Sequence, residues 1–139
     1  MKKSILLILF ILISVQSRAQ QQAKELSQMQ RVMKVHDAIM EKDMGATVKL
    51  IGQLETMAKA AASSAEYESA ITDLKDANKT MVDWMQGFGQ RFTYNEMYKG
   101  KTLTSQKKEQ LKEEEVKLMT MKKQIDASIK KAQLLLNYN

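Results

Sequence analysis

The chain has 139 residues, enough for one domain with an apolar core. It contains no cysteine, which excludes disulfides, iron–sulfur clusters, thiolate metal sites and cysteine nucleophiles. Its 22 basic and 16 acidic residues give a formal net charge of +6. Three of the basic residues, Lys2, Lys3 and Arg18, lie in the first 19 residues, and the excess of +3 that remains beyond them is too mild to indicate a nucleic-acid-binding protein. We therefore expect no nucleic-acid partner.

The first 19 residues have the layout of a secretory signal peptide. Lys2 and Lys3 precede an almost wholly apolar run over residues 5–15, and Ser17-Arg18-Ala19 has small residues at the −3 and −1 positions of a cleavage site. The run has 11 residues, whereas a membrane-spanning helix needs about 18 or more. We expect cleavage after residue 19 and a soluble periplasmic protein without a membrane anchor. Its 19 basic and 16 acidic residues would leave a net charge of +3.

A first helix is expected over residues 22–61, because apolar residues recur at alternating steps of three and four. These positions are Leu26, Met29, Met33, His36, Met40, Leu50, Leu54, Met57 and Ala61. Between them the same phase falls on Asp43 and Thr47, beside Gly45. We therefore expect a bend or an offset near Gly45, with a full break into two helices as the alternative.

A second helix is expected over residues 65–86, in a chain that has no proline and only five glycines. Its apolar face comprises Tyr67, Ala70, Ile71, Leu74, Ala77, Met81, Trp84 and Met85. Ser63 and Glu66 have the spacing of a capping box. Gly87-Phe88-Gly89 follows and is expected to end the helix.

A third helix is expected over residues 104–136, with Thr104 or Ser105 as the N-cap residue. Its apolar face comprises Leu111, Leu118, Met121, Ile125, Ile129, Ala132, Leu135 and Leu136. Glu113, Glu114 and Glu115 lie close to several lysines, which indicates a solvated outer face.

The predicted lengths constrain how the helices pack. At 1.5 Å per residue they would be about 60, 33 and 50 Å long, so the middle helix is too short to cover its neighbours. The connector over residues 87–101 is unusually apolar, and we expect it to fold over the uncovered end with one helical turn near residues 95–99. The predicted fold is all-α, an antiparallel three-helix bundle (up-down-up) with long first and third helices, occupying residues 20–139 after the signal peptide.

No pattern in the chain indicates an enzyme. The one histidine, His36, has no cysteine partner and no recognisable triad. The adjacent glutamates at positions 113–115 cannot converge on one substrate, because consecutive helical residues point in different directions. We therefore expect a non-enzymatic binding or structural module.

The methionines near His36 allow a more specific alternative. Met33, His36 and Met40 share one helical face, and Met81 and Met85 flank Trp84 on the second helix. Thioethers and an imidazole can hold Cu(I), and a histidine with a methionine can ligate haem. The competing interpretation is ordinary core packing, in which methionine fills gaps and His36 bonds a facing polar group such as Asn78.

A further alternative concerns protein partners. An incomplete middle helix would leave an apolar, methionine-rich groove, which could bind varied partners. Such a protein would act as a chaperone-like periplasmic adaptor. Leu103-Thr104-Ser105-Gln106 is similar to the LTxxQ motif of periplasmic stress chaperones, although the glutamine stands one position early. The exposed side of the long first helix could equally pair with a second copy of the chain.

Three segments together resemble a known protein family. They are Met33-x-x-His36-Asp37-x-x-Met40, Met81-Val82-Asp83-Trp84-Met85-Gln86-x-Phe88 and Lys122-Lys123-Gln124-Ile125-Asp126. This combination resembles small exported bacterial helical proteins that often carry the label "viral A-type inclusion protein". The resemblance implies a helical fold and export but no activity. Many members are lipoproteins, and this chain departs from them because it has no cysteine for a lipid.

Overall fold

The computed structural model describes residues 28–137, and within this range the regular secondary structure is entirely helical. The prediction of an all-helical fold is confirmed for these residues. The elements are a helix over residues 28–38, the π-helical turn η1 (Ile39–Asp43), α2 (Met44–Ala60), α3 (Ala65–Arg91), α4 (Tyr94–Tyr98) and α5 (Ser105–Asn137). The predicted signal peptide and the expected start of the first helix at residue 22 lie outside the described residues.

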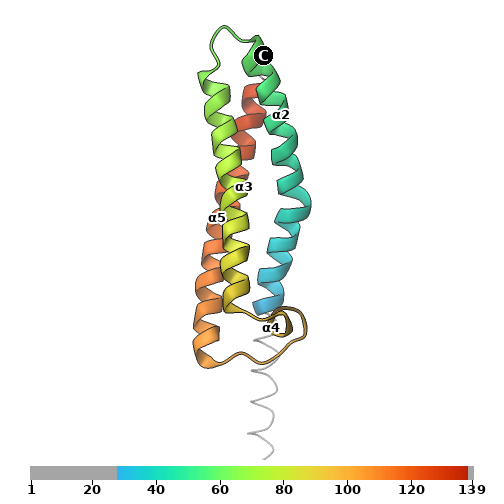
Figure 1. Ribbon diagram of the computed structural model, residues 1–139, viewed down its shortest axis with the longest axis vertical. Helices are drawn as coiled ribbons and strands as arrows, with labels where there is room; N and C mark the ends of the chain where they lie inside the picture. The colour runs from blue at the N-terminus through green and yellow to red at the C-terminus, as the bar shows by residue number, and fades with distance from the viewer. Residues whose placement is uncertain (1–27, 138–139) are drawn as a thin grey trace, which may run out of the picture.

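Three long helical segments lie side by side, and the chain reverses direction at residues 61–64 and again between α3 and α5 (Figure 1). Helix α3 packs against both α2 and α5, which also touch each other. Their apolar faces form two buried clusters. The larger one surrounds Trp84 and Phe88, and the smaller one surrounds Leu54 and Leu74 nearer the 61–64 turn. No helix among residues 28–137 is long and apolar enough to cross a membrane.

The first long segment is continuous from residue 28 to Ala60 and contains one π-helical turn, Ile39–Asp43. A π-turn widens the helix locally and changes which side chains point inward. As a result Ile39 is fully buried and Met40 is 43% exposed, so the prediction that Met40 faces the core is wrong. The chain does not break at Gly45, where a Cβ atom would meet nothing within 4 Å.

The two polar residues that follow Ile39 in the same helical phase also face the interior of the bundle. Asp43 and Thr47 are both buried, and the Thr47 hydroxyl lies 2.7 Å from Asn78 Oδ1 on α3. The same hydroxyl lies 2.8 Å from the Met44 carbonyl oxygen, so it can donate its proton to either acceptor. A hydrogen-bonded polar contact therefore joins α2 to α3 between the two apolar clusters.

Helix α3 is longer than predicted. The expectation that Gly87-Phe88-Gly89 ends it is wrong, because the helix continues through both glycines to Arg91. Phe88 and Phe92 are almost fully buried, so helical geometry at this end brings two large rings into the core. Burying each ring contributes about 1.5–3 kcal/mol, which exceeds the cost of about 1 kcal/mol for each helical glycine.

The start of α3 also differs from prediction. Ser64, not Ser63, is the N-cap residue, and no side-chain capping bond forms there. The Ser64 hydroxyl instead donates to Glu68 Oε1 at 2.6 Å. The capping box of this structure lies at α4, where the Thr93 hydroxyl accepts the Glu96 amide and the Glu96 carboxylate accepts the Thr93 amide.

Helix α5 begins at Ser105, where the Thr104 hydroxyl accepts the Lys107 amide at 3.3 Å. The prediction of a solvated face at Glu114 is wrong. Its side chain is buried, with Oε1 2.9 Å from Arg91 Nη1 and 2.9 Å from Lys117 Nζ. The glutamate thus ties the C-terminal end of α3 to α5.

Candidate functional site

His36 is the only histidine of the chain and is buried, with 8% of the residue exposed. Its Nδ1 lies 3.0 Å from Asp37 Oδ1, so the expected hydrogen bond to Asn78 is wrong. An ionised carboxylate only accepts hydrogen bonds, so a neutral His36 ring carries its proton on Nδ1. The Nε2 lone pair then points into the protein interior, where it has no hydrogen-bond partner among the described protein atoms.

Trp84 on α3 lies next to His36, with the ring centroids 5.7 Å apart. The row of rings continues along α3, with 4.8 Å from Trp84 to Phe88 and 4.6 Å from Phe88 to Phe92. Trp84 Nε1 is the second buried side-chain atom without a hydrogen-bond partner among residues 28–137.

The predicted methionines have different environments. Met33 and Met81 are buried in the cluster that contains Trp84, and Met85 packs against it while partly exposed. Met40 lies on the outside of the π-turn and does not join them. Met29, which shares the predicted helical face of His36, also belongs to this cluster, and so does Met121 on α5, which was not predicted to lie near His36.

This environment limits the cofactors that the residues can hold. Among the described residues, no three His, Asp or Glu side chains come together in a way that fits a metal ion. The set around His36 is one imidazole with thioethers, which are ligands for a soft ion. Haem fits poorly, because only 8% of His36 is exposed and a porphyrin bound to it would have to displace buried side chains.

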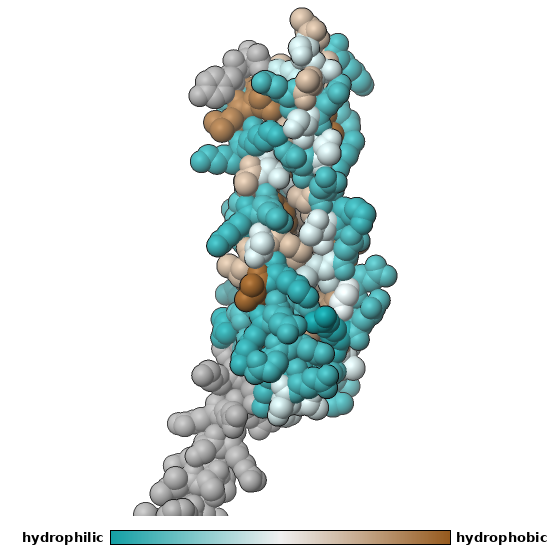
Figure 2. All heavy atoms as spheres, turned by 90° about the vertical axis from the view of Figure 1, so that its left-hand side faces the viewer, coloured by the Kyte–Doolittle hydropathy of each residue, from teal (hydrophilic) through white to brown (hydrophobic). Residues whose placement is uncertain are grey.

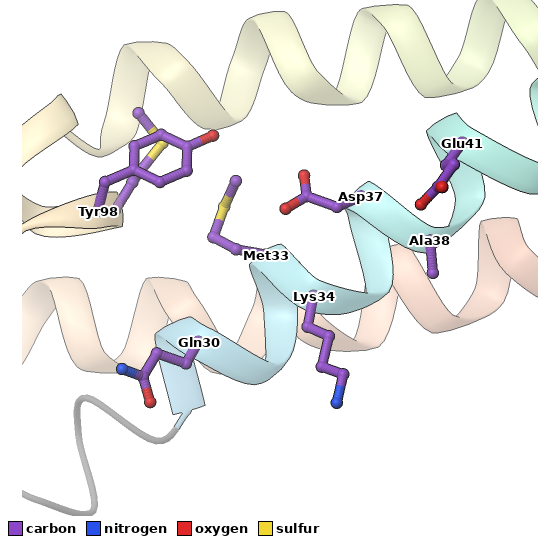
Figure 3. A pocket seen from close by; sticks show the side chains of 8 residues that line it. Gln30, Met33, Lys34, Asp37, Ala38, Glu41 and Tyr98 are labelled. Carbon is purple, nitrogen blue, oxygen red and sulfur yellow. The ribbon is translucent and has the colours of Figure 1, made fainter.

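A groove lies beside His36, between residues 30–41 of the first helix and α4. Its volume is about 460 Å³, and it is lined by Gln30, Met33, Lys34, Asp37, Ala38, Glu41, Met97 and Tyr98. Figure 3 shows Met33 and Asp37 pointing toward Tyr98, whereas Lys34 points to the other side of the helix. The groove therefore combines an apolar floor with acidic groups. The sequence did not reveal it, because Met33 and Tyr98 are distant in the chain.

The surroundings of Tyr98 in the groove raise the pKa of its hydroxyl. Burial raises the pKa of the Tyr98 hydroxyl, and the Asp37 carboxylate and Tyr94 raise it further. The phenol therefore stays protonated and can donate a hydrogen bond to a bound group.

Helix α4, which carries Met97 and Tyr98, is held in place by Glu96. The Glu96 carboxylate is buried and accepts from the Thr93 amide at 2.8 Å, the Thr93 hydroxyl at 2.9 Å and Lys107 Nζ at 2.6 Å. Burial raises the pKa of Glu96, but the contacts with Lys107 and Thr93 lower it more, so the net pKa lies below its ordinary value. This buried ion pair fixes one wall of the groove against the start of α5.

Exposed apolar side chains are spread over several helices, and of the large ones among residues 28–137 only Tyr98 lines the groove. The large ones among the described residues are Met40, Val48, Val82, Tyr94, Tyr98, Val116, Met119 and Leu134. Figure 2 shows one long side of the molecule, where hydrophobic areas are small and separated by hydrophilic ones. Single exposed apolar residues are normal on protein surfaces, so that side offers no obvious binding patch.

Comparison with known proteins identifies no relative. No family model matches this chain, and neither a curated protein nor a solved structure is significantly similar to it.

Proposed function

We propose that this chain is an exported, non-enzymatic helical module that acts by binding a protein segment. In this proposal the signal peptide, residues 1–19, is removed, and the mature protein folds in the periplasm as an antiparallel, up-down-up three-helix bundle. Membership of the family labelled "viral A-type inclusion protein" is part of the proposal and rests on the sequence resemblance alone. The positive n-region, short apolar run and small residues around position 19 support export.

The observation that carries the proposal is the groove between the first helix and α4. Its floor contains Met33 and Met97, whose flexible thioethers adapt to varied apolar side chains. Asp37 and Glu41 supply negative charge on the lining, while Lys34 points away from Tyr98 (Figure 3). Charge complementarity favours a segment with one long aliphatic side chain flanked by lysine or arginine.

Peptide binding tests this proposal. A fluorescently labelled peptide with a leucine between lysines should bind the purified protein with a dissociation constant below about 100 µM by fluorescence anisotropy. The same peptide with glutamates in place of lysines should bind at least about tenfold more weakly. Glu41→Lys should weaken binding of the lysine peptide by about tenfold, because it reverses a charge at the groove.

Asp76→Lys is the matched control, since it makes the same charge change at an exposed position on α3, away from the groove. It should leave the affinity unchanged. Equal affinity for the two peptides, or equal loss in both variants, would contradict the proposed site. If the protein suppresses aggregation of an unfolded client and Glu41→Lys does not change this suppression, a chaperone-like activity belongs to another surface. A dimer that dissociates on Glu41→Lys would identify a second copy of the chain as the occupant.

Export is tested separately by cell fractionation and N-terminal sequencing. The protein should be recovered from the periplasm with Gln20 as its first residue. Recovery of the uncleaved chain from the cytosol would contradict export without bearing on the groove.

A further inference from the structure

We propose that His36 is the nitrogen ligand of a site for a soft monovalent cation, Cu(I), completed by thioether sulfurs of Met33, Met81 and Met85. The site lies in the bundle interior beside Trp84. It shares Met33 with the protein-binding groove, but binding of the ion does not require the partner proposed above.

The His36 ring has the features of a metal ligand that is already oriented. Metal-binding histidines usually donate the second ring N–H to a carboxylate or carbonyl, which fixes the tautomer and the ring direction. Asp37 provides that contact here, with 3.0 Å between Nδ1 and Oδ1. The remaining nitrogen, Nε2, is buried and has no partner among the described protein atoms. Burial without a hydrogen bond is costly for a polar atom, and a metal–nitrogen bond would remove that cost.

The proposed thioether ligands come from the helix that carries His36 and from α3, which carries Trp84. Met33 precedes His36 by three residues in the helix over residues 28–38 and therefore shares its face. Met81 is fully buried, one turn before Trp84 on α3. Met85 follows Asn78 by seven residues, and Asn78 contacts Thr47 on the first long segment. Because residues seven apart lie on nearly the same helical face, Met85 also faces the first long segment.

The donor set selects the ion. One imidazole and neutral thioethers match Cu(I), whereas Mg²⁺, Ca²⁺ and Mn²⁺ prefer oxygen ligands. Trp84 adds an aromatic surface at 5.7 Å from the His36 ring, and a cation near an indole gains a favourable interaction with its π-system. Met33 and Asp37 also line the open groove, so the ion would enter from the groove past these two residues.

Titration of the protein with Cu(I), under anaerobic conditions and against a colorimetric Cu(I) chelator, tests the site. We expect one equivalent to bind with a dissociation constant below about 1 µM. Binding should quench the fluorescence of Trp84, the single tryptophan of the chain. His36→Gln should weaken binding by at least about 100-fold, and Asp37→Asn, which removes the orienting carboxylate but keeps the ligand His36, by about 10- to 100-fold.

Methionine-to-leucine variants separate ligation from folding, because leucine keeps the volume while removing the sulfur. Met33→Leu, Met81→Leu and Met85→Leu should weaken binding, and at least one of them by about tenfold or more. Met57→Leu is the control, since Met57 packs against the other apolar cluster. Affinity weaker than about 100 µM, unchanged binding in His36→Gln, or the same loss in Met57→Leu as in the three site variants would overturn the proposal.

Discussion

Replacing Glu96 with glutamine tests the buried contact that fixes α4 and hence one wall of the groove. Glutamine has nearly the same shape but no charge, so the two bonds from Thr93 become neutral and the Lys107 ammonium loses its oppositely charged partner. The difference is about 1 kcal/mol for each hydrogen bond, and three bonds to one oxygen are not fully additive. Lys107 is partly exposed and regains some hydration. We therefore expect a loss of about 1.5–3 kcal/mol in the free energy of unfolding at pH 7.

The loss should depend on pH in a defined direction. The folded-state pKa of Glu96 lies below its ordinary value, so its charge stabilises the fold at pH values above the unfolded pKa of about 4.3. As the pH falls through the lower folded-state pKa, the native carboxylate becomes protonated and resembles the amide. The difference in unfolding free energy between native protein and Glu96→Gln should then shrink toward zero.

Urea denaturation followed by circular dichroism at 222 nm measures both effects. Glu109→Gln is the matched control, because it makes the same chemical change in an exposed ion pair with Lys112. Such pairs contribute about 0–1 kcal/mol, so the control should lie within about 0.5 kcal/mol of the native protein. A Glu96→Gln effect below about 0.5 kcal/mol at pH 7, or one that is equal at neutral and acidic pH, would refute the reasoning.

Two further substitutions examine the core by the same denaturation assay. Leu74 is fully buried, so Leu74→Ala should lower the free energy of unfolding by about 2–5 kcal/mol. Val82→Ala, on the exposed side of α3, should change it by no more than about 0.5 kcal/mol. Similar values for both variants would mean that the buried face of α3 is misassigned. Thr47→Val should lower the free energy of unfolding by about 1–3 kcal/mol, because it removes the hydroxyl bonded to Asn78. The double variant with Asn78→Leu should lose less than the sum of the two single losses. A coupling energy below about 0.5 kcal/mol would show that the contact does not join α2 to α3.

The helical character of this protein follows from local properties of the chain. Helix propensity and apolar spacing act over a few residues, so they predicted helical segments and the burial of Leu54, Leu74 and Leu118. The same spacing predicted an irregularity near Gly45, and the structure has a π-turn that ends two residues before it, at Asp43. Local patterns wrongly predicted that α3 ends at its two glycines. The helix continues through them because this places the Phe88 ring in the core, against residues that are distant in the chain.

The arrangement of the candidate site around His36 depends on contacts between distant parts of the chain, which local sequence patterns do not contain. Met33, His36, Met81 and Met85 could be named as candidates from helical spacing, but the π-turn decided that Ile39 and not Met40 faces inward. The sequence alone determined which segments become helices, because propensity and periodicity are properties of neighbouring residues. The tertiary structure decided the register of one helix against another, and with it the His36–Trp84 contact and the groove, because register depends on how whole faces pack.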